Sequence, residues 1–341
     1  MAMSSRADRS DPAAPGETGA VLFDPGREVV VATGADRVRF LHGVVTADVA
    51  GTPAGRSVHA TLLTAKAHVL AELRIFVRSE ELYLVVPGGQ GATSAAALGR
   101  YAIMDDFVAT PASDFTIHGL LGRDAAQHLA DAGVSLDALA DGPPWSHAEV
   151  PSPAGPLWLA RVRQLGADGY WLGGSAARLT PVLEALRAAG VPELAPDVAE
   201  AARIQAGEPA WGREITEDYF PMEVGLADTI DYTKGCFLGQ EPIVRIRDRG
   251  HVNWRLVRLK VEAGGDGGRA AAPGDRLESE VKPKAGRITS VARRPDGGVV
   301  ALALAHVSVP AGAMVFVVAE DGQRLARATV SETAAGGANG A

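Results

Sequence analysis

The segment DYTKGCFLGQEPIVR, residues 231–245, contains Cys236, the only cysteine among 341 residues. Gly235 and Gly239 stand on either side of it, and Lys234 precedes it by two positions. A thiolate is a strong nucleophile and metal ligand, and a nearby cation or helix N-terminus favours the thiolate over the thiol. One cysteine forms no internal disulfide, and one thiolate does not hold a zinc ion or an iron–sulfur cluster alone.

A helix is expected just after the cysteine. Pro242 suits the first turn of a helix, so we predict a helix over 241–247 that ends before Gly250. Cys236 would then lie upstream of a helix N-terminus, with Lys234 favouring its thiolate form. The alternative is that Cys236 is a small buried apolar residue in a tight turn, since cysteine is among the most often buried residue types. These residues alone leave both interpretations open.

Composition excludes several classes of function. Lys and Arg number 33 against 41 Asp and Glu, a net charge of −8, which argues against a general nucleic-acid binder. No apolar run reaches the roughly 18–20 residues that span a bilayer, and the first residues lack the apolar core of a secretory signal. P-loop, dinucleotide, G-x-S-x-G and H-E-x-x-H motifs are absent, and the histidines form no close metal-ligand pair. We expect a soluble, cytoplasmic monomer without a metal.

The chain divides into a mixed region and an all-β region. Residues 1–18 and 331–341 are small, polar and glycine-rich, which predicts disordered tails. Residues 19–254 mix strands and helices in irregular order, which favours an α+β fold of two subdomains. Residues 255–330 hold short apolar runs separated by turn signals, which predicts a small antiparallel barrel or sandwich.

Particular elements follow from hydrophobic periodicity. Residues 69–77 and 81–87 alternate as two paired strands around a polar turn. The segment 177–190 has apolar residues at helical spacing. A further helix is expected over 198–206, with Asp197 as its N-cap and a glycine at its end.

The motif K-G-C-F-x-G-Q-E, residues 234–241, resembles the signature of the YgfZ-type folate-binding proteins. That family is related to the aminomethyltransferase, or T-protein, of the glycine cleavage system. The resemblance covers about residues 20–330, and the segments that carry it besides the motif are ADRVRFLHGVVTADV (35–49), the 69–87 hairpin, RIQAGEPAWGREI (203–215), PMEVGLAD (221–228) and AGRITSVARRPDGGVVALALAHV (285–307).

The resemblance implies a ring of three subdomains around a channel that holds the pterin of tetrahydrofolate. T-protein relatives place an acidic pair in the central hairpin to position folate for one-carbon transfer. Here the pair is Ala71–Glu72, so at most one carboxylate remains, which weakens the case for an aminomethyltransferase. The alternative for Glu72 is a solvated position on the surface of a strand.

A second departure lies in the segment that begins at Arg203. Gln205 stands where the R-x-E-A-G pattern has the glutamate that would bind the amino-pyrimidine edge of the pterin. A carboxylate accepts two parallel N–H bonds, whereas an amide accepts only at its oxygen, so folate affinity or pose would change. Gln205 could equally be an exposed helix position. Glu223 is a second candidate for folate contact, or else an ordinary loop carboxylate.

The rest of the signature supplies further candidate folate contacts. Gly235, Gly239, Gln240 and Glu241 would shape and line the site. Arg245, with the neighbouring arginines 247 and 249, could bind the glutamate tail of folate in the two-pronged geometry of guanidinium and carboxylate. A solvated helix face is the alternative for these arginines. Thr46 and Asp48 would line the channel or cap a turn.

Three functions compete. The first is a tetrahydrofolate-binding protein that supports assembly or repair of iron–sulfur enzymes, with Cys236 as the reactive or partner-contacting group and Lys234 as its activator. The second is a folate-dependent aminomethyltransferase or demethylase. The third is a non-enzymatic scaffold for client proteins, in which Cys236 would be structural. Iron–sulfur enzymes or their assembly proteins are the expected partners, as the resemblance implies.

Overall fold

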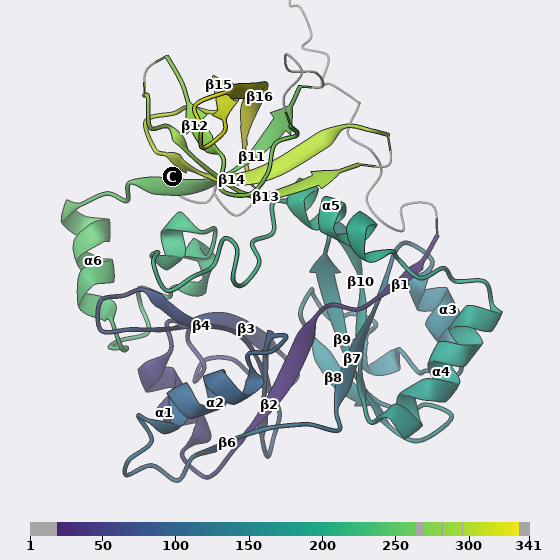
Figure 1. The fold of residues 1–341 in the computed structure, drawn as a ribbon. Helices are drawn as coiled ribbons and strands as arrows, with labels where there is room; N and C mark the ends of the chain where they lie inside the picture. Colours follow the sequence, from purple (N-terminus) through teal and green to yellow (C-terminus); the bar gives the residue numbers. More distant parts are fainter. Residues whose placement is uncertain (1–18, 263–268, 281, 295, 334–341) are drawn as a thin grey trace, which may run out of the picture.

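A computed structural model describes residues 19–262, 269–280, 282–294 and 296–333. The chain forms two five-stranded antiparallel sheets and a closed barrel, and Figure 1 shows the barrel above the two sheets. This confirms the predicted α+β class, the ring of subdomains and the C-terminal barrel. The predicted tails 1–18 and 334–341 lie outside the described residues.

The first sheet has the strand order β3-β4-β5-β2-β6. Its elements are β2 (Arg27–Thr33), α1 (Arg37–Val44), β3 (Ser57–Leu63), β4 (Val69–Val77), β5 (Leu82–Pro87), α2 (Gly91–Gly99) and β6 (Val108–Pro111). The predicted hairpin is the antiparallel pair β4–β5. Strand residues alternate between two cores: Leu73 and Ile75 pack with α1 and α2, whereas Phe76 points to the second sheet.

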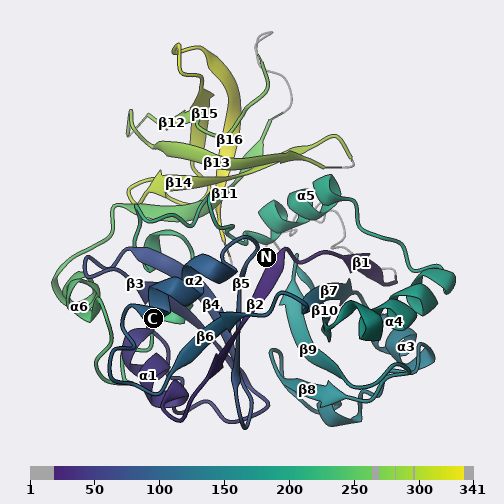
Figure 2. The same ribbon diagram turned by 60° about the horizontal axis from the view of Figure 1, so that its bottom comes forward.

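The second sheet has the order β1-β7-β10-β9-β8. Its elements are β1 (Val21–Phe23), β7 (Thr116–Leu121), α3 (Ala125–Asp131), η1 (Asp137–Leu139), β8 (His147–Val150), β9 (Leu157–Gln164), β10 (Ala167–Gly174) and α4 (Ala176–Ala188). An aromatic cluster joins the two sheets, with the Phe76 ring edge-on to Trp158 at 4.9 Å between centroids. Helices α3 and α4 cover the other face of this sheet (Figure 2).

Strand β1 belongs to the second sheet although the next strand along the chain belongs to the first. Leu22 pairs with Leu120 of β7. Its N–H donates to the carbonyl of Pro192 at 2.9 Å, and its carbonyl accepts from the N–H of Leu194 at 2.7 Å. The segment between β1 and β2 therefore connects the two sheets directly.

The barrel closes because its first strand pairs with both β14 and the last strand. Its strands are β11 (Trp254–Val261), β12 (Arg276–Glu278), β13 (Gly286–Arg293), β14 (Val299–His306), β15 (Met314–Val318) and β16 (Arg324–Glu332). Strand β16 passes the expected end at residue 330, so the prediction of a disordered tail from 331 is wrong for 331–333. The reason is that Ser331 and Glu332 pair with β11, and Thr333 is buried at 2% exposure.

Two predicted helices differ in their ends. The helix α5 (Pro196–Ala206) begins two residues earlier than expected, with Ala195 at the N-cap, so the prediction of Asp197 as the cap is wrong. Pro196 fits the first helical position, and Asp197 lies in the first turn, where the helix dipole favours an acid. The helix α6 (Gln240–Arg249) is longer than predicted and begins after Gly239. The remaining elements are η2 (Pro221–Glu223) and η3 (Ala227–Thr229).

Candidate functional site

The turn that carries Cys236 is fixed by glycines and by one aromatic anchor. Gly235 has φ +103° and Gly239 has φ +76°, conformations that side chains rarely adopt. A Cβ at Gly239 would also meet the carbonyl oxygen of Thr64 at 2.6 Å. Phe237 is buried, whereas Cys236 itself is exposed. The interpretation of Cys236 as a buried apolar residue is therefore wrong.

Lys234 ties this turn to the end of helix α1. Its Nζ donates to the main-chain carbonyls of His42 and Val45, the latter at 2.7 Å, and lies 5.4 Å from the centre of the Phe237 ring. The imidazole Nε2 of His42 is 3.1 Å from the carbonyl of Lys234. Burial lowers the pKa of Lys234 to about 8. The ammonium is thus committed to the carbonyls at a helix C-terminus.

Helix α6 presents its charged residues to solvent. Arg245 pairs with Glu241 at 2.7 Å, with side chains 71% and 83% exposed. The Nε2 of Gln240 donates to the carbonyl of Gly235 at 3.2 Å and so closes the cysteine turn. Ile243 holds the helix in the core. The described contacts of Arg245 are those of a solvated helix face, and its folate-tail role stays a prediction.

Glu72 lies inside the molecule, at the place predicted for the acidic pair. Its carboxylate contacts Nη1 of Arg27 at 2.9 Å and Nε2 of His59 at 3.1 Å, and its side chain is 8% exposed. The alternative of a solvated surface position is therefore wrong. Burial by itself would raise the pKa of Glu72, but the Arg27 charge and the His59 hydrogen bond outweigh it and hold that pKa well below its usual range. Ala71 is buried in the core of the first sheet.

The sequence prediction missed five residues of this cluster, which are Arg27, His59, Asp228, Arg74 and Trp145. Asp228, from η3, approaches the other imidazole nitrogen of His59 at 3.9 Å. Arg74 lies beside His59 in the β3–β4 register, and its guanidinium carbon is 3.7 Å from the ring centre of Trp145. The alternation of β4 could have found Arg74, because residues 72 and 74 share one face of the strand.

Two further candidates have structural contacts. Thr46 is fully buried, and its hydroxyl donates to the carbonyl of Thr229 at 2.7 Å. Asp48 accepts the N–H of Gly51 at 2.8 Å and lies 3.1 Å from Nδ1 of His42. Lining the channel and capping a turn are the two interpretations for these residues. Asp48 caps a turn, whereas Thr46 is buried in the core.

The predicted contacts in the 203–223 region lie at the junction with the barrel. Arg203 pairs with Glu214 at 3.1 Å and donates to the hydroxyl of Ser290 at 2.8 Å, which links α5 to β13. Glu223 is buried and accepts the N–H groups of Phe220 and Trp254 at 3.2 and 3.3 Å. Gln205 is half-buried, and its main-chain carbonyl accepts a hydrogen bond from Nη1 of Arg258 at 2.7 Å.

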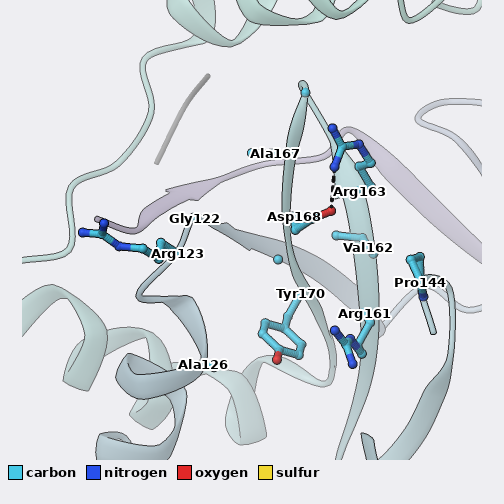
Figure 3. A pocket seen from close by; sticks show the side chains of 12 residues that line it. Gly122, Arg123, Ala126, Pro144, Arg161, Val162, Arg163, Ala167, Asp168 and Tyr170 are labelled. Carbon is cyan, nitrogen blue, oxygen red and sulfur yellow. Dashed lines mark hydrogen bonds and ion pairs between the residues drawn. The ribbon is translucent and has the colours of Figure 1, made fainter. Parts of the chain in front are cut away.

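Surface pockets lie elsewhere. One of about 520 Å³ opens on β9 and β10, where Arg161, Arg163 and Tyr170 line it and Arg163 pairs with Asp168 (Figure 3). A second, of about 290 Å³, lies near Tyr83. Within the described ranges, the residues predicted for the site line neither pocket. No group of three metal-binding side chains occurs among the described residues, and no helix there could cross a membrane.

This fold is that of a protein with a GCVT N-terminal domain. The model of that domain matches residues 19–234, and the chain belongs to this family. Curated relatives named tRNA-modifying protein YgfZ are similar to it. The one from Yersinia enterocolitica is 27% identical over 260 residues, 73% of this chain and 72% of the relative; the one from Yersinia pseudotuberculosis is 28% identical over 278 residues, 80% and 79%.

A solved structure gives the same fold. The aminomethyltransferase T of the glycine cleavage system from Bartonella henselae superposes with a TM-score of 0.81 at 22% identity, covering 94% of this chain and 87% of that one. At this identity the likeness shows the fold. The predicted resemblance to the YgfZ-type and T-protein families is confirmed.

Proposed function

We propose that this protein binds a reduced folate at the Glu72–Asp228 cluster and presents the Cys236 thiol to partner proteins, in support of the assembly or repair of iron–sulfur enzymes. Family membership and the signature around Cys236 support the proposal. Since the relatives are named as tRNA-modifying proteins, we propose that enzymes that modify tRNA are among those it supports.

One observation carries the proposal: the thiol is exposed on a turn that is held from several sides. Lys234 anchors the turn to α1, Gly239 packs against a main-chain carbonyl, and Phe237 is buried. A merely structural cysteine would be buried, and a free surface cysteine would have no need of such support. A fixed, accessible thiol suits repeated contact with a partner.

The cluster offers both kinds of group that a pterin requires. The 2-amino-4-oxo edge of a pterin presents N–H donors beside a carbonyl acceptor. Asp228 supplies an accessible carboxylate, with a side chain 63% exposed, and Arg74 supplies guanidinium donors. When bound, tetrahydrofolate would supply a reduced nitrogen that carries one-carbon units.

The test joins binding with function. Anaerobic calorimetry of the purified chain with tetrahydrofolate should give saturable binding at one site. In cells that lack the protein, Cys236→Ala should fail to restore the activity of an iron–sulfur enzyme that the wild-type chain restores, at unchanged melting temperature, and Cys236→Ser provides the size-matched comparison. Full restoration by Cys236→Ala would favour the scaffold function, and absence of folate binding would overturn the folate part. Turnover of an aminomethyl donor would favour the transferase.

A further inference from the structure

Trp145 and Arg74 form a stacked pair in a strained setting. The guanidinium of Arg74 lies over the indole at 3.7 Å. Trp145 has φ +67°, a strained conformation for a bulky residue that persists where its surroundings enforce it. The main-chain N–H of Trp145 donates to the main-chain carbonyl of Arg161 at 2.9 Å. The main-chain carbonyl of Trp145 accepts from the hydroxyl of Ser57 at 3.0 Å. The indole is thus a fixed platform for Arg74.

The donors of Arg74 are not used within the described part of the chain. There its guanidinium has no hydrogen bond and no ion pair within 4.0 Å, although the side chain is half-buried. A guanidinium carries five N–H donors, and among the described residues those of Arg74 remain available to a ligand. Burial lowers the pKa of Arg74 to about 10, and the group stays charged at neutral pH.

Asp228 is the matching open acceptor. Glu72 is occupied by Arg27 and His59, whereas the side chain of Asp228 is 63% exposed and its ion-pair contact within the described residues is the longer one with His59. Asp228 and Arg74 are close enough that each affects the pKa of the other. His59 lies between them, because it faces Arg74 across the β3–β4 pair and contacts Asp228.

We propose that Asp228 and Arg74 form a two-point receptor for the edge of a planar heterocycle that carries adjacent N–H donors and a carbonyl oxygen. For a pterin, the carboxylate of Asp228 would accept the amino and ring N–H groups, and Arg74, held by Trp145, would donate to the carbonyl. The receptor thus supplies the two-oxygen acceptor that Gln205 does not offer. This inference rests on the proposed binding of folate.

The test measures dissociation constants by calorimetry with 5-formyltetrahydrofolate, which is stable in air. Asp228→Asn keeps the size of the side chain but leaves one acceptor oxygen, and we expect about 10- to 100-fold weaker binding. Arg74→Gln should weaken binding similarly, and Arg74→Lys, which keeps the charge in the half-buried position, serves if the first variant is unstable. Asp168→Asn, a control in the distant β9–β10 pocket, should bind like wild type.

A folate fragment without the pterin tests whether the pterin is the part of the ligand that Asp228 and Arg74 recognise. Binding of p-aminobenzoyl-glutamate, which lacks the pterin, should be the same in wild type and in Asp228→Asn. If the wild-type chain binds 5-formyltetrahydrofolate and both Asp228→Asn and the Arg74 variants bind it equally well, the receptor is refuted while the proposed function stands. If the wild-type chain does not bind reduced folates at all, the proposed function fails first.

Discussion

Replacing Glu72 by glutamine tests the buried cluster directly. The change removes one charge from a carboxylate that contacts Arg27 at 2.9 Å and His59 at 3.1 Å. Breaking a buried ion pair costs about 3–5 kcal/mol, because the remaining charge is left uncompensated. Here the side chain of Arg27 is 22% exposed and water can reach it in part, so we expect Glu72→Gln to lower the free energy of unfolding by about 2–3 kcal/mol.

The same variant has a pH signature. The pKa of Glu72 in the folded chain lies well below the value of 4.5 that an unperturbed glutamate has. When folding lowers the pKa of an acid, the resulting stability is fully present at pH values above the pKa of the unfolded chain. That stability is lost as the pH falls toward the pKa of the folded chain. The stability difference between wild type and Glu72→Gln should therefore shrink as the pH falls below about 4.5.

The assay is urea unfolding followed by tryptophan fluorescence at several pH values. The matched control is Glu241→Gln, which breaks an ion pair of 2.7 Å whose side chains are 83% and 71% exposed. Exposed pairs contribute little, so this control should lose less than about 0.5 kcal/mol. Equal losses for the two variants, or a Glu72→Gln difference that persists unchanged at pH 3.5, would refute the reasoning.

Three other outcomes are expected. Gly239→Ala should lower the urea midpoint clearly more than Gly235→Ala, because both have positive φ but only an added Cβ at Gly239 meets an atom closer than 3 Å; equal midpoints would contradict this. Arg203→Met should lower stability by about 3 kcal/mol, since the fully buried Glu214 loses its cation, and an unchanged melting temperature would argue against that role. Cys236 should react fully with a thiol reagent in the native chain, to the same end point as in denaturant; incomplete native reaction would mean that the thiol is covered.

The elements of the fold were largely predictable because their signals are local. Alternation over 69–77 and the apolar spacing of 177–190 each identify an element without reference to the rest of the chain. The helix after Cys236 was predicted from Pro242, although its length was not. The start of α5 was missed although Pro196 is a local signal for the first helical position, and the end at residue 331 was missed because the last strand pairs depend on β11, which is distant in the sequence.

The site was less predictable because burial is a property of the assembled sheets. Glu72 is buried where Arg27, from β2, and His59, from β3, meet its carboxylate. The sequence places Lys234 two residues from Cys236, which suggested an electrostatic partner, whereas its ammonium reaches carbonyls nearly two hundred residues earlier in the chain. Strand alternation places Arg74 on the face of Glu72, but its stacking on Trp145 depends on the assembled fold.

The position of β1 sets an order on synthesis. Val21–Phe23 leaves the ribosome ahead of every partner it pairs with, and the contacts of Leu22 with Pro192 and Leu194 form only after α4 has emerged. The strands of the first sheet are all complete by Pro111, and β7, the strand that pairs with β1, follows at Thr116–Leu121. A nascent chain can therefore pair β1 with β7 soon after the first sheet is complete, whereas the contacts of β1 with residues 192 and 194 form later in translation, and until then chaperones would protect this edge from non-native pairing.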